Sequence, residues 1–258
     1  MNVPSFLILG TMKGGTTSLF DHLARHPSVT PPVTKEIHFF DLGFRKGPEW
    51  YATQLRAADR SERSPFTGEA SPYYLFHPEA PRRVAETCPL ARLIVLLREP
   101  VARAFSHYHH AVRHGFETLA PEPAFAAEEE RIGPQRRLLQ EGVLEDAPAF
   151  QHLSYQARGR YAEQLEAWLE RFPPSQILVL QSERLFRHPA EVCRQARAFV
   201  GLPDSAARPV GRLNAGAYPA PPPRLAESLR KDFEPANDRL ARLLSARWKQ
   251  ELDFSLWS

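Results

Sequence analysis

Apolar runs alternate with amphipathic segments along this chain. The run "FLIL" at residues 6–9 ends in glycine, and residues 16–27 then repeat apolar side chains at helical spacing. The same order recurs where "LIVLL" at residues 93–97 leads into a helical segment that begins at Pro100. Continuous apolar runs are typical of strands buried on both faces of a parallel sheet. The alternation therefore predicts an α/β fold with a mostly parallel central sheet flanked by helices.

The rest of the chain fits the same pattern less regularly. A further strand is expected at "ILVL", residues 177–180, before another helical segment. Residues 115–155 are rich in Ala, Glu, Pro and Arg and are predicted to form a variable helical insert. Residues 219–258 read as a Pro-rich linker followed by two amphipathic C-terminal helices. We expect one domain over residues 1–258.

Composition narrows the class of protein without revealing a ligand. The chain has 258 residues and is 43% hydrophobic, enough to bury the core of a single domain. Its net charge of +3 does not indicate nucleic acid. Only five of the 33 basic residues are lysine, a bias typical of a GC-rich bacterial genome. The two cysteines show no metal spacing, and no apolar run reaches the ~20 residues of a membrane span, so we expect a cytoplasmic protein.

The segment "GTMKGGTTS", residues 10–18, partly matches a phosphate-binding loop of the form G-x-x-x-x-G-K-[ST]. Thr16 stands at the lysine position, and Lys13 lies three residues earlier. Glycines let backbone amides curl around an anion, and the following helix adds its dipole and free N–H groups. A plain glycine turn with a hydroxyl cap is the alternative. The candidate anion-binding residues are Lys13, Gly14, Gly15, Thr16, Thr17 and Ser18.

A second candidate follows the strand at residues 93–97. Arg98 ends that strand, and Ser106 lies about two turns into the next helix. A guanidinium and a hydroxyl in this arrangement can hold a phosphate. A sheet-edge arginine and a solvent-facing serine are the alternative. Because ligands of open α/β sheets bind beyond the carboxyl ends of the strands, both segments are expected to serve one ligand.

Together these segments resemble the sulfotransferases that use 3′-phosphoadenosine 5′-phosphosulfate (PAPS). In that family the first loop holds the 5′-phosphosulfate, and the second holds the 3′-phosphate through an arginine and a serine, here Arg98 and Ser106. The segment "KEIHFFD", residues 35–41, resembles heparan-type glycosaminoglycan sulfotransferases, and "GEASPYYL" continues the likeness. The resemblance implies a P-loop NTPase-like sulfotransferase fold, PAPS as co-substrate, adenosine 3′,5′-bisphosphate as product, and no metal.

Sulfuryl transfer needs a carboxylate beside the donor to take the proton of the acceptor. Glu36 is the candidate, and the resemblance implies that it is the general base; a surface carboxylate paired with Lys35 is the alternative. His38 could orient the acceptor or assist Glu36, or it could be a packed, hydrogen-bonded histidine. The expected catalytic residues are thus Glu36, Lys13 and His38, acting mainly by in-line positioning and electrostatic stabilisation.

The acceptor is less well defined. Glu69 and Ser71 are predicted to face the same cleft and contact the acceptor, and Arg212 is predicted to share in phosphate binding. Heparan-type relatives commonly carry a lysine where Ala70 stands, which argues against a heparan-like acceptor. A hydroxyl or amine of a glycan or a small molecule is expected, with the pocket built from variable loops. Oligomeric state cannot be derived.

Two other functions are compatible with parts of the sequence. An Mg²⁺-dependent P-loop kinase would need a lysine at position 16 and a metal-binding acid after a strand, and the sequence shows neither. A non-catalytic nucleotide-binding protein would bind the donor without turnover. The histidines of "HYHHAVRH", residues 107–114, lack a completing cysteine or carboxylate, so no metal site is predicted there.

Overall fold

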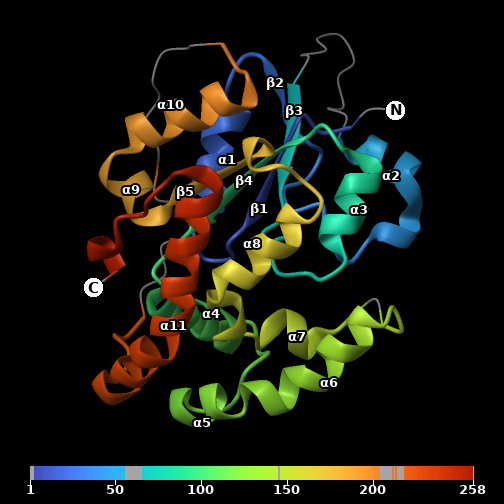
Figure 1. Cartoon of the computed structure of the whole chain (residues 1–258). Coiled ribbons are helices and arrows are strands. Elements are labelled where there is room, and N and C mark those ends of the chain that lie inside the picture. Colours follow the sequence, from blue (N-terminus) through green and yellow to red (C-terminus); the bar gives the residue numbers. More distant parts are fainter. Residues whose placement is uncertain are drawn as a thin grey trace. The chain divides into compact units, whose positions relative to one another are not determined.

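The computed structural model describes residues 3–55, 66–144, 146–203 and 218–257, together with Gly211 and Leu213. Its strands are β1 (Phe6–Gly10), β2 (Val29–Thr30), β3 (Phe66–Ala70), β4 (Arg92–Leu97) and β5 (Ile177–Gln181). Its α-helices are α1 (Thr16–Ala24), α2 (Gly47–Gln54), α3 (Ala80–Thr87), α4 (Pro100–Arg113), α5 (Pro121–Ala126), α6 (Glu128–Gln140), α7 (Pro148–His152), α8 (Tyr161–Leu169), α9 (Ser182–Arg187), α10 (Pro189–Val200) and α11 (Pro223–Trp248) (Figure 1). Four short 3₁₀ segments are Phe44–Lys46, Ala157–Gly159, Pro174–Gln176 and Phe254–Trp257.

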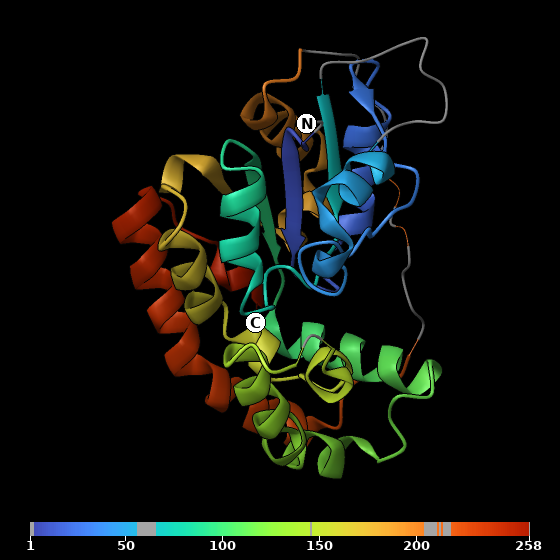
Figure 2. The same ribbon diagram turned by 90° about the vertical axis from the view of Figure 1, so that its right-hand side faces the viewer.

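These elements divide into two compact units. The first consists of Met1–Leu97 and Trp168–Asn214 and contains the strands that the structure describes; the described elements of the second, Arg98–Ala167 and Ala215–Ser258, are helical. The sheet order is β2-β3-β1-β4-β5, and every described strand pair is parallel. Figure 2 shows β1 (dark blue) beside β3 (teal) in the middle of the first unit. The predicted α/β class with a parallel central sheet flanked by helices is confirmed.

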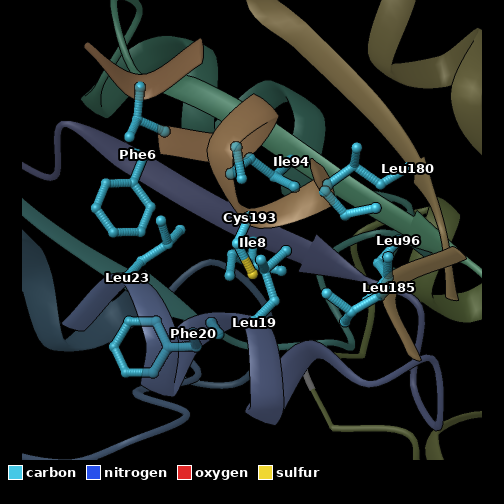
Figure 3. Close-up of a cluster of buried hydrophobic side chains, with 14 of the residues drawn as sticks. Phe6, Ile8, Leu19, Phe20, Leu23, Ile94, Leu96, Leu180, Leu185 and Cys193 are labelled. Carbon is cyan, nitrogen blue, oxygen red and sulfur yellow. The ribbon is translucent and has the colours of Figure 1, made fainter. Parts of the chain in front are cut away.

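The residues of β1, and those of β4 after Arg92, are apolar and buried, the pattern typical of strands covered on both faces of a parallel sheet. Phe6 and Ile8 of β1 point to one face, where α1 and α10 cover them together with side chains of β4 (Figure 3). Leu7 and Leu9 point to the opposite face and are also fully buried. Gly68 of β3 is required at this packing distance, because a Cβ there would lie 2.5 Å from the ring of Phe6.

The second unit packs α4 and α11 around one apolar cluster. The cluster contains Val101, Ala104, Phe105, Tyr108, Ala111, Ala124, Phe125, Tyr155, Ala226, Leu229 and Phe233. Residues 115–155, predicted to be helical, contain α5, α6 and α7. Within the described residues, no helix combines the length and the apolar character that crossing a bilayer requires.

The prediction of two C-terminal helices is wrong. One helix, α11, continues through Pro235 from Pro223 to Trp248. An internal proline costs a helix about 3 kcal/mol, because it removes a hydrogen bond and crowds the preceding turn. The buried side chains Leu229 and Phe233 before Pro235 and Leu240 and Leu244 after it keep one helical stripe, and burying that whole stripe offsets the cost.

Candidate functional site

The loop between β1 and α1 is a tight turn in which certain positions accept only glycine. A Cβ on Gly14 would lie 2.6 Å from the carbonyl oxygen of Leu96, so a larger residue does not fit. Gly15 has φ of 92° and Lys13 has φ of 69°, both in the left-handed region. The N–H of Gly14 donates to the carbonyl of Thr11 at 2.9 Å. Gly14 therefore provides close approach of the backbone rather than a free donor.

The N-terminus of α1 follows this loop directly. Within the described residues no side chain caps it, so the N–H groups of its first turn and its dipole are available to an anion. Lys13 and Thr17 are half-buried, and Thr16 is buried in the first turn. Ser18 is buried as well, and its Oγ accepts the N–H of Leu213 at 3.1 Å. The loop thus combines a cation, hydroxyls and an uncapped helix end.

Glu36 lies in a chain of ionisable groups. Its Oε1 contacts Nζ of Lys35, and its Oε2 lies 3.6 Å from Nε2 of His38. On the other side of the ring, Nδ1 of His38 lies 2.8 Å from Oδ2 of Asp41. Glu36 and His38 have φ of 60° and 55°, which is uncommon for residues other than glycine. The backbone therefore adopts a strained turn to bring these side chains together.

These contacts shift the pKa values of Glu36 and His38 in opposite directions. Burial raises the pKa of Glu36, but hydrogen bonds with His38 and Lys35 outweigh this effect and lower the pKa to about 2. Burial lowers the pKa of His38, but hydrogen bonds with Asp41 and Glu36 raise it to about 10. At neutral pH the cluster therefore holds an ionised Glu36 beside a protonated His38. His38 in this state cannot take a proton.

Sequence reasoning did not assign Asp41, whose side chain is fully buried. Nη1 of Arg83 donates to the carbonyls of Phe40 and Asp41, at 3.0 and 2.8 Å, and holds this part of the chain from α3. The signal in the sequence was an aspartate three residues after His38, the spacing at which the two side chains meet. A local His-x-x-Asp pattern beside a candidate base could have identified it.

Glu69 and Ser71 are placed differently from the expectation. Glu69 lies within β3 and Ser71 directly after it, and both side chains are fully buried. Oγ of Ser71 donates to Glu69 at 2.8 Å and accepts the N–H of His38 at 3.1 Å. Both residues thus bond to other parts of this chain, and this geometry favours a supporting role over direct contact with an acceptor.

The glycine loop after β1 and the Glu36 cluster lie at the same edge of the sheet. β1 and β3 are parallel neighbours, so their carboxyl ends meet at one edge. The N–H of Leu75, in the segment after β3, donates to the carbonyl of Leu9 at 2.9 Å. A Cβ on Gly10 would lie 2.8 Å from Cβ of Leu75 and 3.1 Å from the carbonyl of Pro72. Ser71, which holds His38, is therefore packed beside the start of the phosphate loop.

Arg98 and Ser106 belong to the helical unit. Arg98 follows β4 directly, and its carbonyl accepts the hydroxyl of Tyr161 at 2.7 Å. The Glu99 carboxylate caps α4 by accepting the N–H groups of Val101 and Ala102. Since this carboxylate already uses the helix end, a phosphate here would depend on side chains. Ser106 is buried in α4 rather than facing solvent.

Two other predictions concern Arg212 and the histidine run at residues 107–114. Arg212 lies outside the described residues. His107 is fully buried whereas His114 is exposed, so the histidine run does not present one common surface. In the described part of the chain, no three or more His, Cys, Asp or Glu side chains are grouped so that they could hold a metal ion.

Comparison with known proteins gives a consistent result. A family model of the sulfotransferase domain matches residues 4–215. Heparan sulfate glucosamine 3-O-sulfotransferase 3B1 of Mus musculus is 32% identical over 214 residues, which cover 78% of this chain and 46% of that protein. Bifunctional heparan sulfate N-deacetylase/N-sulfotransferase 3 of Homo sapiens is 30% identical over 215 residues, covering 78% of this chain and 22% of that protein. The chain thus spans less than half the length of these relatives.

A solved structure matches over the full length. The sulfotransferase from Alicyclobacillus acidocaldarius has a TM-score of 0.72 and 31% identity, and the match covers 100% of this chain and 99% of that one. The sulfotransferase domain from the curacin biosynthetic pathway, at 16% identity and a TM-score of 0.51, shares the fold. With the family model matching most of its length, this chain belongs to the sulfotransferase family.

Proposed function

We propose that this protein transfers a sulfuryl group from PAPS to a hydroxyl or amine of a glycan or small-molecule acceptor. The observation that carries the proposal is the presence, at one sheet edge, of a glycine loop with an uncapped helix start and of an ionised carboxylate. The family match supports sulfuryl transfer as the reaction class. The two named relatives are heparan sulfate enzymes, which supports a glycan as one class of acceptor.

The loop geometry fits a phosphosulfate. Gly14 lets the backbone approach closely, and the uncapped start of α1 offers N–H donors. Lys13 supplies a positive charge for the bridging oxygen and the leaving 5′-phosphate, a task that needs no metal ion. Thr16 and Thr17 would add hydroxyl donors. Arg98 and Ser106 would bind the 3′-phosphate, and Arg212 is proposed as a further contact.

Glu36 would act as the general base. As the acceptor oxygen or nitrogen bonds to sulfur, the bond from sulfur to the bridging oxygen breaks, and adenosine 3′,5′-bisphosphate leaves. The acceptor proton passes to the Glu36 carboxylate, which is ionised at neutral pH. Protonated His38 cannot serve as the base, so it orients Glu36 through the 3.6 Å contact. Most of the catalysis would come from alignment and charge stabilisation.

Calorimetric titration with adenosine 3′,5′-bisphosphate tests the donor assignment directly. We expect saturable binding without Mg²⁺, and no binding at millimolar concentration would rule out a PAPS enzyme. ATP hydrolysis that depends on Mg²⁺ would instead support a P-loop kinase. Transfer of labelled sulfate to a panel of glycans and small molecules would then define the acceptor. One domain over residues 1–258, a bacterial origin and a cytoplasmic location stay predictions of the sequence.

A further inference from the structure

Glu69 is a carboxylate buried in the interior of the sheet. It pairs in register with Leu7 of β1, and its side chain is fully buried. Burying an ionised carboxylate costs several kcal/mol unless hydrogen bonds or a counter-ion compensate. In the described part of the chain no lysine or arginine forms an ion pair with it. Three hydroxyls compensate the Glu69 carboxylate by donating hydrogen bonds to it, those of Tyr51 (2.7 Å), Tyr74 (2.9 Å) and Ser71 (2.8 Å).

Two of these hydroxyls also accept hydrogen bonds from backbone amides close to Glu36. Oγ of Ser71 accepts the N–H of His38 at 3.1 Å, and the hydroxyl of Tyr74 accepts the N–H of Phe39 at 2.8 Å. A hydroxyl has one hydrogen to donate. In Ser71 and Tyr74 that hydrogen points to the Glu69 carboxylate, which only accepts hydrogen bonds. The lone pairs of the two hydroxyls are therefore turned toward the amides of His38 and Phe39.

The segment that receives these bonds needs external support. Glu36 and His38 both have positive φ, a conformation that costs roughly 1–3 kcal/mol for each such residue and persists only where surrounding contacts enforce it. The amides of His38 and Phe39 lie two and three residues after Glu36. Tyr51 contributes differently, since its ring stacks on Phe39 at 4.3 Å, and within the described residues its hydroxyl accepts no backbone amide.

We propose that Glu69 is a positioning residue: through the hydroxyls of Ser71 and Tyr74 it holds the 36–39 backbone in the turn that presents the Glu36 carboxylate. This inference rests on the proposed role of Glu36 in sulfuryl transfer. It gives Glu69 and Ser71 a task inside the protein, in place of contact with the acceptor. Tyr74 joins them, although the sequence pattern did not single it out.

The three hydroxyls provide a matched experiment. Ser71→Ala, Tyr74→Phe and Tyr51→Phe each remove one hydrogen bond to Glu69, but only the first two also release a backbone amide. Hydrogen–deuterium exchange of a peptide covering residues 34–41 should be at least about tenfold faster in Ser71→Ala and Tyr74→Phe, and unchanged in Tyr51→Phe. Thermal unfolding of each variant establishes that it is folded.

Kinetics give the second readout. With labelled PAPS and the acceptor identified by the panel of glycans and small molecules, kcat should fall about 10- to 100-fold in Ser71→Ala and Tyr74→Phe, because small misplacements of a catalytic group have effects of this size. The dissociation constant for adenosine 3′,5′-bisphosphate should not change. Glu69→Gln should behave similarly, since an amide cannot accept from all three hydroxyls.

The outcomes separate the two proposals. Equal exchange of the 34–41 peptide in all the single variants, or an equal loss of kcat in Tyr51→Phe, would overturn the positioning role. A native protein that binds no adenosine 3′,5′-bisphosphate would instead overturn the proposed function. In that case the exchange measurement still decides whether Glu69 holds the segment.

Discussion

Replacing Asp41 with asparagine tests what controls the charge of His38. The buried Asp41 carboxylate lies 2.8 Å from Nδ1 of His38, and the pKa of His38 is about 10 although burial lowers it. With this pKa, about 99% of His38 is protonated at pH 8. Asp41→Asn removes the first of the contributions that raise the pKa, while the effect of burial stays. If the pKa falls to the ordinary value of about 6.5, only about 3% is protonated at pH 8.

Histidine NMR titration between pH 5 and pH 10 measures this change. We expect the midpoint of His38 to move from about 10 toward 6.5 in Asp41→Asn. Sulfuryl transfer should then decline above about pH 7 in the variant, because neutral His38 no longer orients Glu36 as an ion pair. Asp21→Asn is the control, since it makes the same charge change on α1, where Asp21 forms an ion pair with Arg25. A His38 midpoint that stays near 10 in Asp41→Asn would refute the reasoning.

The same shift predicts how stability depends on pH. The folded pKa of His38 is raised, so its contribution to stability is complete below the unfolded value of about 6.5 and is lost as pH rises toward 10. The free energy of unfolding of the native protein, measured by chemical unfolding, should therefore be lower at pH 9 than at pH 6. The loss should be smaller in Asp41→Asn, and an unchanged difference between the two pH values would contradict the linkage.

Three further substitutions test the site. Glu36→Gln should reduce kcat by about 10²- to 10⁴-fold, the usual contribution of a general base, while calorimetry shows unchanged binding of adenosine 3′,5′-bisphosphate; normal turnover would exclude the role. Lys13→Ala should reduce transfer from PAPS by about 10²- to 10³-fold, as expected when one charge-stabilising donor is lost, and a variant with native kcat would count against the phosphosulfate loop. Gly14→Ala should lower the free energy of unfolding in urea by about 1–3 kcal/mol, because its Cβ would meet the Leu96 carbonyl at 2.6 Å; a fully stable variant would contradict that contact.

Local pattern determined much of this protein. The apolar runs of β1 and β4 predict parallel buried strands, since continuous apolar runs are typical of strands covered on both faces. The glycines of the loop at residues 10–15 predict a tight turn before a helix, because Gly15 has a positive φ and a Cβ on Gly10 or Gly14 would meet neighbouring atoms. The strand β2 spans only Val29–Thr30, too short for periodicity to reveal.

Only the tertiary structure decided how the candidate base is held. Ser71 and Tyr74 meet the amides of His38 and Phe39 across 33 and 35 residues of sequence. No periodicity links such positions, because their contact depends on which strands are neighbours and on where the chain turns between them. The burial of Glu69 has the same origin, since β3 lies between β2 and β1. The sequence by itself determined the strands of the apolar runs, the glycine loop and the family resemblance; the folded chain decided that Glu69 supports the 36–39 turn from inside the sheet.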